Sequence, residues 1–99
     1  MQLSKKIEDN RLTVLIEGRI DTTTAPQLEG ELRQIVTDEV IDLIFDFSKV
    51  EYMSSAGIRV IMSAEKIMRR QGAMTLIHVN EDIMEILEMT GLIDILTVQ

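Results

Sequence analysis

Two consecutive serines, Ser54 and Ser55, lie in the segment VEYMSSAGIRV, where an apolar run gives way to a helical pattern. A serine at such a junction could cap a helix, attack a substrate, bind an anion or accept a phosphate. These four roles require different surroundings. A nucleophile needs a base beside it, whereas a cap or a phosphate acceptor needs only its place at the start of the helix.

Other residues that could support catalysis or bind a metal are scarce. His78 is the only histidine and lies in an apolar segment, where a structural role near a strand end is the more common one. The chain has no cysteine, so a typical transition-metal site is not expected. The five glycines form neither a P-loop nor a dinucleotide fingerprint, and SSAG lacks the leading glycine of a nucleophile elbow. The sequence therefore predicts neither an enzyme nor a cofactor.

Strand patterns precede and follow the serines. Residues 11–20 alternate apolar and polar side chains, and the turn EDNR joins them to a shorter strand at residues 3–8. Residues 41–48 are rich in Ile, Leu and Phe, which predicts a central strand that is buried on both faces. Two later strands are expected at residues 73–79 and 93–98.

Three helical patterns separate the later strands. Thr24 with Pro26 marks the start of the first, Asn80 caps the third, and Gly72 and Gly91 end the second and third. The expected core faces are Ala25, Leu28, Leu32, Ile35 and Val36; then Gly57, Val60, Ile61, Ala64, Ile67 and Met68; then Ile83, Ile86, Leu87 and Thr90. The order β-β-α-β-α-β-α-β predicts an α/β fold with parallel later strands and with helices mainly on one face of the sheet.

The composition predicts one globular domain and argues against two kinds of partner. The chain has 99 residues, and 45% of them are hydrophobic, which is enough for a core without disulfides. A net charge of -7 and an aromatic content of 3% argue against nucleic acid and anionic membranes as partners. No apolar run approaches the roughly 18 residues of a membrane span, and the N-terminus lacks a signal-peptide pattern. A cytoplasmic location is expected.

Local physics alone favours a structural role for the serine pair. Ser54 or Ser55 would cap the helix, Ala56 favours helix, and Gly57 lets the helix approach the sheet closely. Capping does not exclude modification, because a cap serine lies at a surface junction within reach of another protein's active site.

Three segments together resemble the anti-sigma factor antagonists of the STAS domain family. VLIEGRIDTTTAPQLE is similar to the G-x-[IL]-D strand end and following helix of the family, LIFDFSKVEYMSSAGIRVI to its central signature, and ILEMTGLIDIL to its closing segment. They occur in the family's order over about residues 8–97. The combination is specific, whereas SSAG alone is not. The sequence departs from the family at Ser54, where Asp is most common.

This resemblance implies a STAS fold, with a small mixed β-sheet flanked by helices in a single domain over residues 1–99, and a phosphorylation switch. The unmodified protein would bind an anti-sigma factor with serine kinase activity, phosphorylation would release it, and a serine phosphatase would restore it. The phosphoacceptor maps to Ser55, with Ser54 as the second choice, and the family's acidic residue maps to Asp21, expected beside the serines. The protein is expected to be monomeric when free. The expected partner-binding residues are Asp21, Thr22, Met53, Ser54, Ala56, Gly57, Ile58, Arg59 and Met62.

Several alternatives stay open at this point. Ile58 and Met62 either widen the buried stripe of their helix or contact the partner. The same fold could serve as the STAS subunit of a lipid-transport ABC complex, or as a nucleotide-binding or scaffold module of a larger signalling assembly. A hydrolase that uses Ser55 ranks last, because no base accompanies it.

Overall fold

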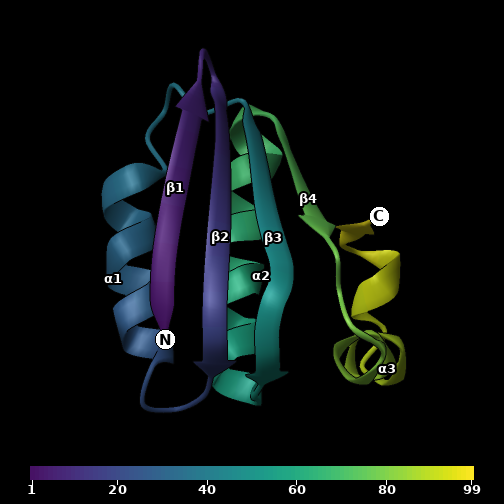
Figure 1. Ribbon diagram of the computed structural model, residues 1–99. Helices are drawn as coiled ribbons and strands as arrows, with labels where there is room; N and C mark the ends of the chain where they lie inside the picture. The colour runs from purple at the N-terminus through teal and green to yellow at the C-terminus, as the bar shows by residue number, and fades with distance from the viewer.

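Five strands form one mixed sheet, in the element order that the sequence predicts. The computed structural model describes residues 1–99. The strands, in their order across the sheet, are β1 (Gln2–Glu8), β2 (Arg11–Ile20), β3 (Asp42–Met53), β4 (Ala73–Ile77) and β5 (Thr97–Val98). The helices are α1 (Ala25–Ile35), α2 (Ser55–Gln71), α3 (Glu81–Met89) and the short 3-10 helix η1 (Leu92–Asp94). Strand β1 is antiparallel to β2, while the remaining neighbours are parallel. Figure 1 shows α1 and α2 on one face of the sheet and α3 beyond β4.

The core lies between the sheet and the helices on one face only. Alternate side chains of β2 and β3 are buried there, while Leu15, Ile44 and Asp46 between them are only half-buried. The prediction that residues 41–48 are buried on both faces is therefore wrong. Because the strands follow one another in sequence order, successive right-handed crossovers place their helices on the same face. The buried residues of β2 and β3 are Leu12, Val14, Ile16, Ile20, Leu43, Phe45, Phe47, Val50 and Met53.

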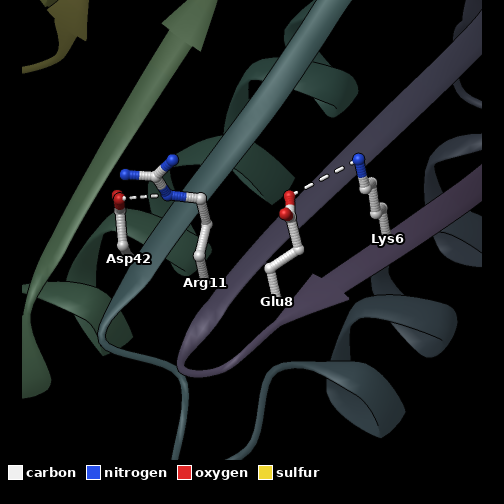
Figure 2. A network of polar contacts seen from close by, with 4 residues as sticks. All are labelled: Lys6, Glu8, Arg11 and Asp42. Carbon is white, nitrogen blue, oxygen red and sulfur yellow. Dashed lines mark hydrogen bonds and ion pairs between the residues drawn. The ribbon is translucent and has the colours of Figure 1, made fainter.

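Ion pairs occupy part of the open face. Figure 2 shows Arg11 of β2 beside Asp42 of β3, with 2.9 Å between Nε and a carboxylate oxygen. Lys6 and Glu8 of β1 form a longer pair at 3.5 Å, and both side chains are largely exposed. Exposed pairs of this kind contribute little to stability. These charged side chains of β1, β2 and β3 show that this part of the open face is exposed to water.

The helix boundaries agree closely with the predicted caps. Asn80 caps α3, since its Oδ1 accepts a hydrogen bond of 2.8 Å from the N–H of Ile83. Gly91 has a φ of 77° and follows the end of α3. Gly72 ends α2 for a different reason: its backbone is extended, and a Cβ there would collide with the carbonyl oxygen of Ile41. Close approach of two backbones therefore requires this glycine.

Three expectations about the core faces of the helices and about the last strand are wrong. Ile67 is 43% exposed, because it lies at the margin of the buried stripe of α2. Thr90 is exposed at the end of α3 rather than part of its core face. The last strand comprises only Thr97–Val98, because residues 92–94 form the 3-10 helix η1 instead.

Candidate functional site

Ser54 is the cap of α2. Its backbone is extended, with φ −86° and ψ 176°, and its Oγ accepts a hydrogen bond of 3.4 Å from the N–H of Gly57. The N–H of Ser54 donates to the carbonyl of Ile20 at 2.8 Å, which ties the loop to the end of β2. Ser54 is half-buried. Its hydroxyl and its backbone both serve the junction between sheet and helix.

Ser55 is the first residue of α2, and its side chain is free. It is exposed, and its hydroxyl makes no hydrogen bond within the chain. The sequence left open which serine caps the helix. The structure divides the two roles: Ser54 satisfies a backbone donor, while the hydroxyl of Ser55 faces solvent at the helix start.

Gly57 and Met53 fix the position of this helix start against the sheet. A Cβ on Gly57 would lie 2.7 Å from Cγ2 of Ile20 and 2.8 Å from Cγ of Met53, so the helix packs there without a side chain. Met53 itself is 1% exposed, and Gly57 is buried. The expectation that these two residues contact a partner is therefore corrected by their burial. They hold the surface in place instead of forming it.

Asp21 organises the turn between β2 and α1. Its Oδ1 accepts hydrogen bonds from the backbone N–H groups of Thr23 at 2.9 Å and Thr24 at 3.0 Å. The hydroxyl of Thr24 in turn accepts from the N–H of Asp21 at 2.9 Å. These bonds, the one from the Thr24 backbone first, hold the pKa of the Asp21 carboxyl below its usual value. Asp21 thus has a structural role that the resemblance did not imply.

The remaining predicted residues surround the two helix starts. Thr22 and Arg59 are exposed, whereas Ala56, Ile58 and Met62 are half-buried and pack against the core. Between the starts of α1 and α2 lies a hollow of about 230 Å³. We call it the helix-start hollow, and it is lined by Thr22, Ala25, Pro26, Glu29, Ala56, Arg59 and Val60.

The half-buried position of Ile58 and Met62 is compatible with both earlier interpretations. Each side chain packs against the core and still reaches the surface. The site as a whole lies at one end of the sheet. Because β2 and β3 are parallel, the Asp21 turn that follows β2 and the serines that follow β3 lie at the same end.

Sequence reasoning missed one pair at this end of the sheet. The guanidinium carbon of Arg19 lies 4.4 Å from the centre of the Tyr52 ring, and the two residues are neighbours in the β2–β3 register. Such a cation–π contact depends on the pairing of two residues that are 33 positions apart in the sequence, which no local pattern reveals. Thr24 was predicted only as a helix-start residue. The spacing of Asp21 and Thr24 is the signal that could have identified the turn.

The structure contains no cluster of three or more acidic, histidine or cysteine side chains that could hold a metal ion. Nor does any of its helices have the length and apolar character of a membrane span. His78 is exposed at the end of β4, and its Nδ1 lies 3.0 Å from Oδ1 of Asp46. Partial burial alone would raise the pKa of Asp46, but hydrogen bonds from His78 and Ser48 outweigh it and hold this pKa below its usual value.

Comparisons with known proteins agree with this geometry. The model of the STAS domain family matches residues 2–99. The anti-sigma-B factor antagonist of Listeria monocytogenes is 31% identical over 96 residues, which are 96% of this chain and 84% of that protein. A crystal structure of an anti-sigma factor antagonist from Mycobacterium paratuberculosis superposes with a TM-score of 0.89 at 23% identity, covering 98% of this chain and 83% of that chain.

The same fold recurs in SpoIIAA, an anti-sigma factor antagonist. Its unphosphorylated form matches with a TM-score of 0.77 at 12% identity, over 99% of this chain and 87% of that chain. Its phosphorylated form matches with a TM-score of 0.76. The predicted mixed α/β fold is confirmed. From the family match over nearly its whole length and the similarity to the Listeria protein, the chain belongs to the STAS domain family, among the anti-sigma factor antagonists.

Proposed function

We propose that the unmodified protein binds an anti-sigma factor that is also a serine kinase, and that phosphorylation of Ser55 ends this binding. Several relatives are named as antagonists of anti-sigma factors, which supports the choice of partner. SpoIIAA is known in a phosphorylated and an unphosphorylated form, which supports phosphorylation as the switch. Binding of the antagonist would free the sigma factor, and release would let the anti-sigma factor capture it again.

The observation that carries this proposal is the free hydroxyl of Ser55 at an exposed and well-fixed helix start. The kinase would transfer the γ-phosphoryl group of ATP to the Oγ of Ser55, with the hydroxyl proton passing to a base of the kinase and ADP leaving. The chain itself contributes only the acceptor. Members of this family are generally regulatory proteins rather than enzymes, and we assign no catalytic role to any residue.

The added phosphate would disrupt the interface without unfolding the domain. It brings a charge of about −1.5 to −2 at neutral pH. The N-terminus of α2 accommodates negative charge, so the isolated domain tolerates the phosphate. A partner whose surface fits the neutral hydroxyl would instead have to desolvate that charge and has no group of its own to bind it, which is unfavourable. A serine phosphatase would reverse the change by hydrolysis, restoring the hydroxyl and releasing inorganic phosphate.

The proposed surface consists of the predicted residues that reach solvent around Ser55. These are Asp21, Thr22, Ser54, Ala56, Ile58, Arg59 and Met62. A kinase that uses ATP fits a cytoplasmic protein. The proposed switch uses one phosphoacceptor serine in each chain. It therefore requires only a single domain that is monomeric when free.

The test has two stages. Immobilised protein should capture a GHKL-type kinase from an extract of the source bacterium, whereas capture of an ABC-type ATPase would favour the lipid-transport alternative. Incubation of the captured kinase with ATP and the protein, followed by peptide mass spectrometry, should then place one phosphate on Ser55. The variant Ser55→Ala should remain unmodified, and the matched variant Ser54→Ala should still be phosphorylated. Phosphate on Ser54 alone, or on neither serine, would contradict the proposal.

A further inference from the structure

Arg59 lies one helical turn after Ser55 on the exposed face of α2. Both residues are exposed, and four positions along a helix place them about 40° apart around its axis. Side chains in an α-helix tilt toward its N-terminus, so a long side chain covers the turn that precedes it. The guanidinium of Arg59 is therefore within reach of any group attached to the Oγ of Ser55.

Arg59 has no acidic partner in the unmodified protein, whereas most other arginines are engaged. Three of them form ion pairs with a carboxylate, and a fourth lies over an aromatic ring. The engaged residues are Arg11 with Asp42, Arg33 with Glu29, Arg69 with Glu65, and Arg19 over Tyr52. A guanidinium without a partner beside the proposed phosphorylation site is free to bind a new anion.

The carboxylates on the α1 side of the site are already engaged. Glu29 shares the helix-start hollow with Arg59, but its Oε1 lies 3.0 Å from a guanidinium nitrogen of Arg33. Asp21 accepts hydrogen bonds from the backbone of Thr23 and Thr24. The first turn of α2 contains no acidic residue of its own. These carboxylates would therefore compete only weakly with a phosphate on Ser55 for the guanidinium of Arg59.

We propose that Arg59 is the intramolecular counter-ion of the phosphate on Ser55, an inference that rests on the proposed function. A guanidinium binds phosphate oxygens through two parallel hydrogen bonds, and an anion four residues before a cation is the favourable order in a helix. The pairing would also draw the guanidinium away from Thr22 and the rest of the helix-start hollow. Phosphorylation would then remove the positive charge of Arg59 from the surface that meets the partner. It would also add the negative charge of the phosphate to that surface.

The experiment installs phosphoserine at position 55 of the full chain by genetic encoding, which makes it independent of any kinase. Phosphorus NMR titration gives the second pKa of the phosphate, which is about 6 without neighbours. We expect this pKa to be about 0.15–0.4 higher in Arg59→Gln than in the wild type, as for a surface pair at this spacing. Arg59→Lys should restore part of the difference. Concentrated NaCl should shrink it.

The matched control is Arg70→Gln. Arg70 is also an exposed arginine of α2 without an acidic partner, but it lies about four turns from Ser55. Its replacement should leave the phosphate pKa at the wild-type value, while circular dichroism verifies that all variants fold. Equal pKa values in the wild type and Arg59→Gln would overturn the inference.

The outcomes also separate this inference from the proposed function. If the kinase does not modify Ser55 in the peptide analysis, the proposed function fails, although the NMR comparison can still show the ion pair. If Ser55 is modified but the phosphate pKa is the same in the wild type and in Arg59→Gln, only the counter-ion role fails.

Discussion

The starts of α1 and α2 lie at the same end of the sheet but are built differently. The backbone donors before α1 are bound by the carboxylate of Asp21, through bonds of 2.9 and 3.0 Å. At α2 a single neutral hydroxyl, that of Ser54, accepts one bond of 3.4 Å, and the first turn has no acidic residue. Negative charge is therefore already present at one start and absent at the other. The comparison indicates why the proposed phosphate would fit the second start: it would add the negative charge that this helix lacks.

The largest expected effect tests whether the open start of α2 is the binding surface. Ser55→Asp should fold normally, because a carboxylate near a helix N-terminus is neutral or mildly favourable. In the complex the same carboxylate would be desolvated, at a cost of about 2–5 kcal/mol, so affinity for the anti-sigma kinase should fall at least about 30-fold. Ser55→Ala should bind nearly as well as the wild type. Calorimetric titration of both variants makes the comparison, and equal affinities would mean that this start is not the switch.

The second prediction concerns the contact that fixes the start of α2. Gly57→Ala should destabilise the protein by about 1–3 kcal/mol, because its Cβ would press on Ile20 and Met53. The matched control is Gly30→Ala in α1, where a Cβ meets nothing within 4 Å. That change should stabilise the helix by about 0.5–1 kcal/mol. Urea unfolding should move the two midpoints in opposite directions. If Gly57→Ala were also neutral or stabilising, the close packing at this start would be refuted.

A smaller effect distinguishes the two serines. Ser54→Ala removes the cap of α2 and should cost about 0.5–1 kcal/mol, toward the low end of capping energies because the bond is long. Ser55→Ala removes no hydrogen bond and should change the free energy of unfolding by less than about 0.5 kcal/mol. Chemical denaturation of both variants checks the order. The reverse order would assign the cap to Ser55 and undermine the division of roles.

The smallest effect concerns the closed start of α1. The pKa of Asp21 is lowered in the folded state, so its ionised form contributes stability above the unfolded value of about 3.8, and this stability is lost as pH falls through the lower folded pKa. Asp21→Asn keeps an acceptor but does not titrate. Its thermal midpoint should be close to that of the wild type at pH 7, and the wild type should lose more on acidification below about pH 4.

Thermal scans of both proteins from neutral to acid pH test this expectation. Parallel curves would mean that the hydrogen bonds of the carboxylate add no pH-dependent stability. Slower phosphorylation of Asp21→Asn with an unchanged fold would link the α1 start to the proposed interface as well.

Local patterns were sufficient for much of the fold, because periodicity and caps are written in neighbouring residues. The alternation of Leu12, Val14 and Ile16 identified the buried side of β2, and Asn80 identified the start of α3. Tertiary placement decided the rest. Ile44 matches a doubly buried strand, yet it faces the side of the sheet that no helix covers. Ile67 fits the helical period and still reaches solvent at the margin of its stripe.

The candidate site shows the same limit. The resemblance pointed to Ser55 and Asp21, and both lie at one end of the sheet. It also pointed to Met53 and Gly57, which are buried. The helical period had already placed Gly57 on the core face of α2, whereas the burial of Met53 depends on how closely α2 approaches the sheet. The pairing of Arg19 with Tyr52 was equally hidden, since it depends on the register of two parallel strands.

The close packing of Gly57 on Ile20 and Met53 also bears on the timing of the proposed switch. The start of α2 rests on the sheet without an intervening side chain, so it has little freedom to shift. Modification of Ser55 would therefore not be followed by a slow conformational change. The protein would change its partner as fast as the phosphate is added or removed. Each molecule would then retain its last modification as a chemical memory, with a lifetime set by the kinase and phosphatase rather than by the fold.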